Sequence, residues 1–212
     1  MSALPFTTTF VLASAALAVA PGPDILYVLA KGISQGRRAA IVSAAGFCSG
    51  LTIHTAASVC GLSALLVASA NAFTVAKLLG AAYLIFLGVR VLFSRGLISL
   101  PENATPLSSR KIFVQAFLMN VLNPKVALFF LAFLPQFIRS GQGSLPTQLF
   151  LLGIGFGLIS FVVFVLVGLF SAAIGKHIRT RPGLTRLFDR LAGVAFILLG
   201  LRLALTGVTT ER

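Results

Sequence analysis

The stretch Pro21-Gly22-Pro23-Asp24 constrains the fold of this chain more than any other. It lies inside the first long apolar segment, residues 6–30. Two prolines and a glycine break a helix, because each proline lacks a backbone donor and its ring clashes with the preceding turn. Asp24 is the only acidic residue within a long apolar segment. Broken backbone and a carboxylate are tolerated at membrane depth only where protein or a water-filled cavity surrounds them. The stretch therefore predicts a polar cavity inside a membrane domain.

The composition supports a membrane domain. Of the 212 residues, 58% are hydrophobic and 10% are charged, and the mean hydropathy is +1.02. A soluble domain carries about 25% charged residues. The net charge of +13 does not indicate a nucleic-acid partner, because the basic residues cluster in short loops between apolar segments, as in membrane proteins. We expect an integral membrane protein in contact with the lipid bilayer.

Six apolar segments have the length of about 20 residues that a bilayer-spanning helix needs. They cover residues 6–30, 39–60, 72–93, 112–134, 147–175 and 190–208. No Lys or Arg precedes the first segment, so we expect a permanent span and not a cleaved signal peptide. No soluble domain fits between the segments. The chain predicts an all-α membrane protein with a single transmembrane domain over residues 1–212.

The Lys and Arg residues predict the orientation of the spans. The loops between spans one and two, three and four, and five and six hold Lys31, Arg37, Arg38, Arg90, Arg95, Arg110, Lys111, Lys176, Arg179, Arg181, Arg186 and Arg190. The opposite side holds only Lys77, Arg139, Arg202 and Arg212. Because cytoplasmic loops are enriched in Lys and Arg, the first group is expected in the cytoplasm and both termini outside.

The two halves of the chain resemble each other. Residues 23–36 (PDILYVLAKGISQG) align with residues 124–137 (PKVALFFLAFLPQF) at an offset of 101. Residues 77–90 (KLLGAAYLIFLGVR) align with residues 190–202 (RLAGVAFILLGLR) after one deletion. The alternative, chance similarity between spans rich in Leu and Gly, is weaker for both pairs together than for the second pair alone.

Each half contains three spans, so the second half must enter the membrane from the opposite face. The predicted fold is therefore two inverted-topology repeats of three helices, at about residues 1–93 and 112–208. A cytoplasmic linker at about residues 94–111 joins them, and spans one and four are broken. In secondary transporters with such repeats, the substrate site lies near the midplane on the discontinuous helices.

The second break is the stretch Asn120-Val121-Leu122-Asn123-Pro124-Lys125. A pseudo-two-fold axis that exchanges the halves would bring Asp24 and Lys125 together. A zwitterion such as an amino acid offers an ammonium to Asp24 and a carboxylate to Lys125, and Asn120 and Asn123 add uncharged donors and acceptors. Asp24 is also the acid placed to exchange a proton within the bilayer. The alternative is a structural ion pair that holds the halves together.

Three further features allow two interpretations each. His54, in the second span, is a candidate proton relay because its pKa lies near physiological pH, or it is hydrogen-bonded within the bundle. The glycine pairs at residues 46 and 50 and at residues 153 and 157 favour close helix packing over a pore-lining or hinge role, and glycine-rich faces also allow a homodimer. Cys48 and Cys60 lie twelve residues apart in one segment, roughly 18 Å along a helix, and are expected to be buried apolar residues rather than redox groups.

Other classes of protein have little support in the sequence. A Walker motif is absent, which argues against ATP-driven pumping. Neither a Ser-His-Asp constellation nor a cluster of metal ligands is present, so we expect no enzyme activity, no cofactor and no bound metal.

At these positions the sequence resembles the LysE/RhtB family of bacterial amino-acid exporters. The matching stretches are PGPD with ILYVLAKGISQGRRAA (residues 21–40), AAGFCSGL (residues 44–51) and FLMNVLNPKVALFFLAFLPQFI (residues 117–138). The resemblance implies six spans, a location in the bacterial inner membrane and export driven by the proton gradient. Family substrates include basic amino acids, threonine, homoserine and leucine. The family pattern supports Asp24, Asn123, Pro124 and Lys125 as functional positions.

The sequence thus predicts a secondary transporter that exports amino acids or close analogues by proton antiport. Its mechanism would be alternating access about the two broken helices. Three alternatives stay open: a non-transporting membrane scaffold, an exporter of another small metabolite or a metal ion, and a membrane redox enzyme that uses the two cysteines.

Overall fold

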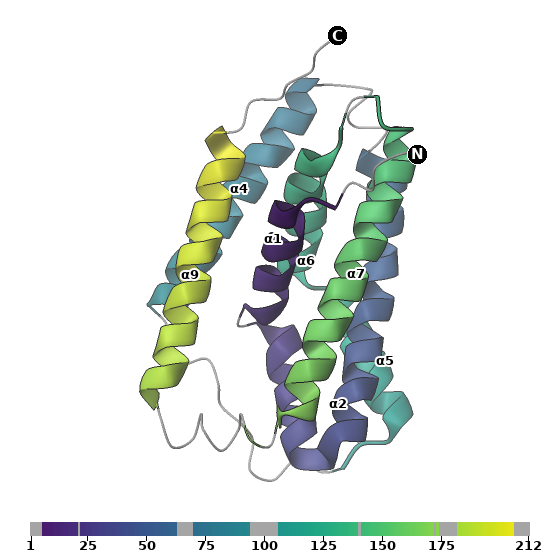
Figure 1. Ribbon diagram of the computed structural model, residues 1–212, viewed down its shortest axis with the longest axis vertical. Coiled ribbons are helices and arrows are strands. Elements are labelled where there is room, and N and C mark those ends of the chain that lie inside the picture. Colours follow the sequence, from purple (N-terminus) through teal and green to yellow (C-terminus); the bar gives the residue numbers. More distant parts are fainter. Residues whose placement is uncertain are drawn as a thin grey trace.

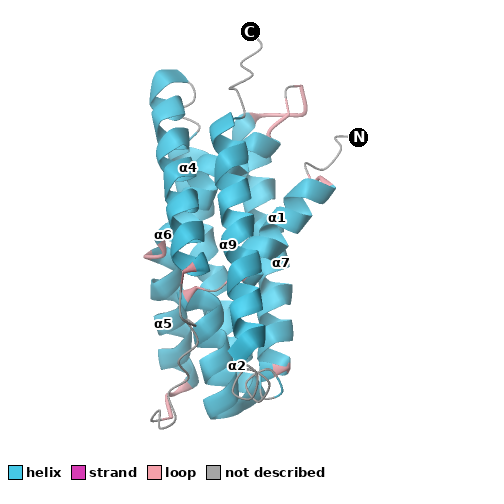
Figure 2. Cartoon of the chain, turned by 90° about the vertical axis from the view of Figure 1, so that its left-hand side faces the viewer, coloured by secondary structure: helices cyan, strands magenta, loops and turns pink. Residues whose placement is uncertain are grey.

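The computed structural model describes residues 6–20, 22–62, 70–93, 106–139, 141–171, 173 and 182–205. Within these ranges every secondary-structure element is a helix, and the helices run roughly along one axis (Figures 1 and 2). Two helices are long and apolar enough to cross a membrane, Pro23–Gly61 and Leu145–Leu169. A bent pair, Ser109–Val121 with Pro124–Phe137, passes the same test as one span, with 46° between its parts. The prediction of an all-α protein with membrane-type helices is confirmed.

The first predicted helix break is present. Helix α1 (Thr8–Val19) begins at the side chain of Thr7, which accepts a hydrogen bond from the backbone N–H of Phe10. Helix α2 begins at Pro23, after Gly22 in an extended conformation. Proline suits the first position of a helix, because the N–H it lacks has no partner there. Pro21 lies outside the described residues.

Helix α2 (Pro23–Ala57) contains a reversal that the sequence analysis placed in a loop. Gly36 has a φ of 82°, which glycine adopts at little cost. A Cβ built on Gly32 would lie 3.3 Å from the Cβ of Ala40, whereas residues eight apart in a straight helix are about 12 Å apart. The parts of α2 before and after Gly36 therefore run side by side in opposite directions (Figure 1).

The predicted loop around residues 31–38 is consequently wrong. These residues are helical except at Gly36. Lys31, expected in that loop, is buried, and its ammonium lies 5.4 Å from the ring centroid of Tyr27. The side chain of Gln35 donates to the carbonyl oxygen of Leu107 and accepts from its N–H, at 2.9 and 3.1 Å. This contact fixes the reversal to the segment that leads into α5.

The second predicted break is also present. Helix α5 (Ser109–Val121) ends before Leu122, and helix α6 (Pro124–Leu128) follows. The chain continues from α6 as a π-helix, Phe129–Phe133 (η2), and then as a 3-10 helix, Leu134–Phe137 (η3). Asn123 caps α6, because its side-chain oxygen accepts from the N–H of Lys125 at 3.0 Å. Both breaks therefore have the same order: a residue at the N-cap position of the next helix, then a proline, then a charged residue.

Glycines bring the central helices into close contact. Helix α7 (Leu145–Leu169) runs antiparallel to the second part of α2. The wide helical turn η1 (Ser58–Leu62) follows the last residue of α2. A Cβ on Gly153 would lie 2.5 Å from Oγ1 of Thr55. One on Gly46 would lie 2.5 Å from the carbonyl oxygen of Phe113 in α5, and one on Gly50 would lie 2.7 Å from Oδ1 of Asn120. Close packing is confirmed at these three glycines, whose faces are thus used within the chain.

Helices α4 (Ala70–Leu92) and α9 (Pro182–Leu205) form a second packed pair at one side of the bundle (Figure 1). A Cβ on Gly88 would lie 2.6 Å from the carbonyl oxygen of Gly193, and one on Gly200 would lie 2.8 Å from that of Ala81. The two helices are therefore antiparallel. Helix α9 begins at Pro182, earlier than the span predicted from residue 190.

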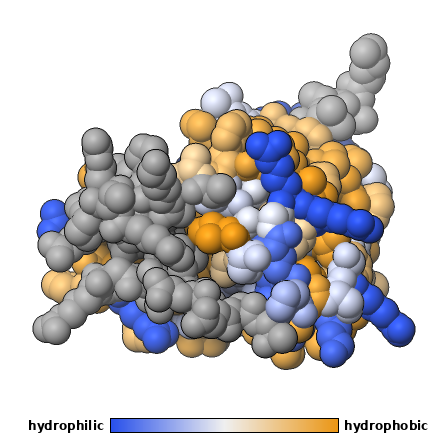
Figure 3. All heavy atoms as spheres, turned by 90° about the horizontal axis from the view of Figure 1, so that it is seen from below, coloured by the Kyte–Doolittle hydropathy of each residue, from blue (hydrophilic) through white to orange (hydrophobic). Residues whose placement is uncertain are grey.

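Basic side chains gather at the end of the bundle where α2 reverses and α5 begins. Arg37, Arg38, Arg110 and Lys111 are exposed there, and Figure 3 shows hydrophilic side chains over this end. The cysteines are both free; Cys48 is half-buried and Cys60 is exposed. The prediction that Cys60 is buried is wrong, because its part of η1 lies at the surface.

Candidate functional site

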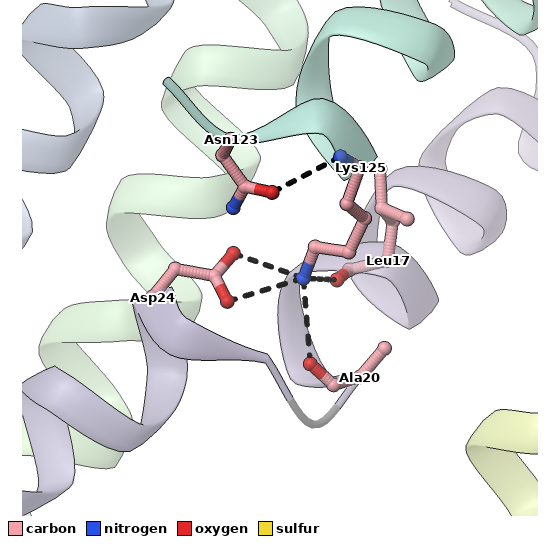
Figure 4. A network of polar contacts seen from close by, with 5 residues as sticks. All are labelled: Leu17, Ala20, Asp24, Asn123 and Lys125. Carbon is pink, nitrogen blue, oxygen red and sulfur yellow. Dashed lines mark hydrogen bonds and ion pairs between the residues drawn. The ribbon is translucent and has the colours of Figure 1, made fainter. Parts of the chain in front are cut away.

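The two helix breaks meet at an ion pair between Asp24 and Lys125. The lysine Nζ lies 2.9 Å from Oδ2 and 3.1 Å from Oδ1 of the aspartate (Figure 4). The side chain of Asp24 is 3% exposed and that of Lys125 is 6% exposed. Since a lone charge at mid-membrane costs about 2.5–3.5 kcal/mol on insertion scales, each charge offsets much of the cost of the other. The offset of 101 residues in the sequence thus corresponds to a direct contact.

Lys125 has two further acceptors, at the end of α1. Its ammonium donates to the carbonyl oxygens of Leu17 at 3.3 Å and Ala20 at 3.5 Å. The last carbonyls of a helix lack partners within the helix and form its negative end. Asp24 lies in the first turn of α2, at a positive helix end. Both charges therefore sit where a helix dipole stabilises them.

Gly22 lies directly beneath the ion pair. A Cβ at this position would lie 2.7 Å from Oδ1 of Asp24 and 2.9 Å from Nζ of Lys125. Its φ of −167° is an extended conformation that any residue adopts. The requirement for glycine is therefore steric, since a side chain would push the two charges out of place.

A small cavity adjoins the ion pair. Its volume is about 10 Å³, and polar residues that line it include Asp24, Asn120, Lys125 and Ser160. This is close to the smallest volume that holds one water molecule. Two polar atoms of lining residues, Oδ1 of Asn120 and Oγ of Ser160, are buried without a hydrogen-bond partner among the described residues, as is Nδ2 of nearby Asn123. Most buried polar atoms in proteins are paired, so this concentration marks a place suited to a polar ligand.

Two aromatic side chains, Phe156 and Phe164, line the cavity, and each belongs to a larger group of packed rings. Toward the start of α1 and the end of η3 lie the stacked and edge-on rings of Phe10, Phe129, Phe130, Phe133, Phe137 and Phe156. Toward the basic end, Phe47 contacts Tyr27 and Phe164, with ring centroids 5.9 and 5.8 Å apart. The polar cavity therefore lies between two groups of apolar aromatic rings.

His54 lies beside this cavity but does not line it. Its Nε2 is 3.1 Å from the backbone carbonyl oxygen of Asn120, an acceptor that requires a proton on this nitrogen. His54 also lines a second cavity of about 260 Å³, together with Ala57, Ser58, Gly61, Ala127, Phe130 and Leu131. The histidine thus stands between an open apolar cavity and the second helix break.

The structure brings together most of the residues predicted from the sequence. Asp24, Asn120, Asn123 and Lys125 lie around one point, Gly22 and Pro23 form the first break, and Pro124 forms the second. Ser160 and the carbonyl oxygens of α1 were not predicted. A lone serine in an apolar helix gives no distinct signal, and backbone oxygens give none at all. Among the described residues, no group of three His, Cys, Asp or Glu side chains could hold a metal ion.

Comparisons with known proteins show the family of the chain. The family model described as LysE type translocator matches residues 15–207. The homoserine/homoserine lactone efflux protein of Salmonella typhimurium is 33% identical over 92% of the chain and 94% of its own length. An uncharacterized membrane protein of Vibrio cholerae is 32% identical over the same shares. The uncharacterized membrane protein YrhP of Bacillus subtilis is 28% identical over 91% of the chain and 95% of its own length. No solved structure matches the chain significantly.

Proposed function

Because the chain belongs to the LysE type translocator family, we propose that it is a secondary transporter that exports amino acids or close analogues from the cytoplasm by proton antiport. The observation that carries this proposal is the buried ion pair of Asp24 and Lys125 at two helix breaks. It lies beside a cavity lined by Asn120 and Ser160, whose side-chain oxygens lack hydrogen-bond partners in the part of the chain that the structure describes. A protein scaffold has no need of such a pair at two matched breaks, which disfavours the non-transporting alternative.

A zwitterionic substrate fits the chemistry of this site. Its ammonium would pair with Asp24, and its carboxylate would pair with Lys125 and accept from Nδ2 of Asn123, which has no hydrogen-bond partner among the described residues. Asn120 and Ser160 offer polar atoms for a short polar side chain. Two relatives carry the name homoserine/homoserine lactone efflux protein, and homoserine has such a side chain. Another small metabolite with an ammonium group is the second candidate.

The proposed architecture is six spans in two inverted repeats within one domain. Helix α1 with the first part of α2 would form span one, and α5 with α6 would form span four. The matched order of residues at the two breaks and the direct contact of Asp24 with Lys125 support this symmetry. The antiparallel contacts of Gly88 and Gly200 across the α4–α9 pair support it as well. A homodimer would need a face other than the glycines already packed within the chain.

Transport would proceed by alternating access to the cavity beside the ion pair. The volume of about 10 Å³ is too small for an amino acid, so one aromatic layer must open to admit it. The basic end with Arg37 and Arg110 would face the cytoplasm, following the positive-inside rule. This orientation places both termini outside the bacterial inner membrane. The layer with Phe47 and Phe164 would then be the cytoplasmic gate.

Coupling would arise at Asp24. A proton that enters from outside would neutralise the carboxylate and release the substrate ammonium, so the proton and the substrate compete for one group. His54 is the candidate relay for this proton, because it lies between the open cavity and the break. Its hydrogen bond to a backbone carbonyl also suits a purely structural role.

Proteoliposomes loaded with single amino acids, including homoserine, test this proposal. Efflux of one substrate class should accelerate when a proton gradient is imposed. The acidic solution is the one that faces the end of the protein proposed to lie outside the cell. The Asp24→Asn variant should lose this acceleration, because its side chain cannot bind and release a proton. Gradient-driven efflux that persists in Asp24→Asn would contradict coupling at Asp24. The absence of efflux for every amino acid would contradict the proposed substrate class.

A further inference from the structure

The ammonium of Lys125 occupies a set of four oxygen acceptors contributed by the first helix break. Two are the carboxylate oxygens of Asp24, at 2.9 and 3.1 Å, and two are the carbonyl oxygens of Leu17 and Ala20, at 3.3 and 3.5 Å. All four belong to residues 17–24, whereas the lysine comes from the other half of the chain (Figure 4). The first break is therefore a complete cation site before Lys125 is considered.

The ligand that these oxygens fit is a primary ammonium. Carbonyl and carboxylate oxygens accept N–H hydrogen bonds, and the –NH₃⁺ group has three donors and no acceptor. The negative end of α1 and the charge of Asp24 both favour a positive ligand. A quaternary ammonium has the same charge but no N–H group, so it could not satisfy the carbonyl oxygens.

A second position for the lysine ammonium exists in the same cavity. Oδ1 of Asn120 and Oγ of Ser160 are buried and lack a hydrogen-bond partner among the described residues, and both residues line the cavity with Lys125. A lysine has four rotatable side-chain bonds, so its ammonium can change position while α6 stays in place. The cavity that Lys125 lines therefore offers its ammonium other acceptors than the four oxygens of the first break.

We propose that the four oxygens form the site for the substrate ammonium, and that Lys125 occupies it only while the transporter is empty. Substrate binding moves the lysine toward Asn120, Ser160 and the substrate carboxylate. The assignment of this ammonium site to the substrate rests on the function proposed above. The ammonium of Lys125 thus replaces the substrate ammonium in the empty transporter.

This exchange keeps the cavity electrically neutral. The empty site contains one carboxylate and one ammonium, and a zwitterion adds one further charge of each sign. Asp24 is paired both with substrate bound and in the empty, proton-free state shown by the structure. Neither state therefore leaves an isolated carboxylate in the membrane interior.

Removal of the lysine ammonium tests the site directly. In the purified Lys125→Met variant, the four oxygens lose their ligand, and ethylammonium chloride should restore one. We expect its melting temperature in detergent to rise saturably by about 2–4 °C with ethylammonium, because a ligand that binds only the folded state stabilises it. The wild-type protein, whose site is filled, should not respond. Tetramethylammonium and sodium chloride at equal concentration should leave both proteins unchanged.

Two controls isolate the site. The Lys31→Met variant loses another buried lysine, which lies over Tyr27, and should show no response to ethylammonium. The Asp24→Asn/Lys125→Met double variant lacks the carboxylate and should also not respond. If Lys125→Met is not recovered folded, the second measurement is its recovery as a monodisperse protein when it is purified in ethylammonium.

The proposal is overturned if ethylammonium neither stabilises nor rescues Lys125→Met. It is also overturned if sodium or tetramethylammonium acts equally well, because the site would then recognise charge without N–H donors. The assay uses no gradient and no amino acid. Its failure is therefore distinguishable from a failure of the transport function, which the efflux of the wild-type protein decides.

Discussion

At the scale of single residues, the site depends on which groups are charged and which are small. Asp24 and Lys125 are buried and paired, and Gly22 leaves the space that the pair occupies. The pairing could be predicted from the sequence, because the alignment of residues 23–36 with residues 124–137 places an acid and a base at the two breaks. The participation of Ser160 and of the α1 carbonyl oxygens could not, because it depends on which atoms remain unpaired after the helices pack.

The Gly22→Ala variant tests the steric requirement. Its Cβ would lie 2.7 Å from Oδ1 of Asp24, so the ion pair must shift or the break must widen. We expect a loss of about 1–3 kcal/mol of stability, the usual cost of overpacking, together with reduced efflux. Melting temperature and proteoliposome efflux are the measurements.

Gly157→Ala is the matched control for this substitution. Its Cβ would meet only the side chain of Leu51, at 3.9 Å, an ordinary contact. Equal melting temperatures and efflux for the Gly22→Ala and wild-type proteins would show that the ion pair does not need this space.

At the scale of helices, the breaks were predicted correctly and the reversal at Gly36 was not. Proline and asparagine at residues 21–24 and 120–125 have direct backbone consequences, so the sequence locates both breaks. The polar stretch at residues 34–38 (SQGRR) is typical of a loop. The structure instead keeps it helical around one residue with positive φ, because Gly32 and Ala40 are small enough to let the two parts of α2 meet.

The Gly36→Ala variant tests this reversal. Gly36 has a φ of 82° and a ψ of −179°, a backbone conformation that is essentially restricted to glycine, and an alanine there costs roughly 1–3 kcal/mol. We expect a lower melting temperature in detergent while the ion pair and substrate specificity stay intact. Gly61→Ala is the control. Gly61 is not among the described glycines with positive φ, and its added Cβ would lie more than 4 Å from every other described side chain and backbone segment that it could clash with. A Gly36→Ala protein as stable as Gly61→Ala would mean that the chain can reverse there without a glycine.

At the scale of the whole molecule, two breaks from distant parts of the chain enclose one polar cavity between apolar layers. Helix positions such as Ala70–Leu92 and Leu145–Leu169 lie close to the segments predicted at 72–93 and 147–175, because length and hydropathy determine them. The lining of the cavity by Phe156 and Phe164 follows from side-chain packing among several helices. Nineteen phenylalanines in the chain give no indication of which ones meet.

The central claim, that the paired breaks form the substrate site of a carrier, is tested most directly by counterflow. Proteoliposomes are loaded with unlabelled homoserine, and uptake of a trace of labelled homoserine is followed without any ion gradient. A carrier with alternating access accumulates the label transiently. We predict this overshoot for the wild-type and Gly157→Ala proteins, and a decrease of at least about tenfold, or 1.4 kcal/mol, for Asp24→Asn and Lys125→Met. Undiminished overshoot in both charge variants, or none in the wild-type protein with any amino acid, would contradict the account.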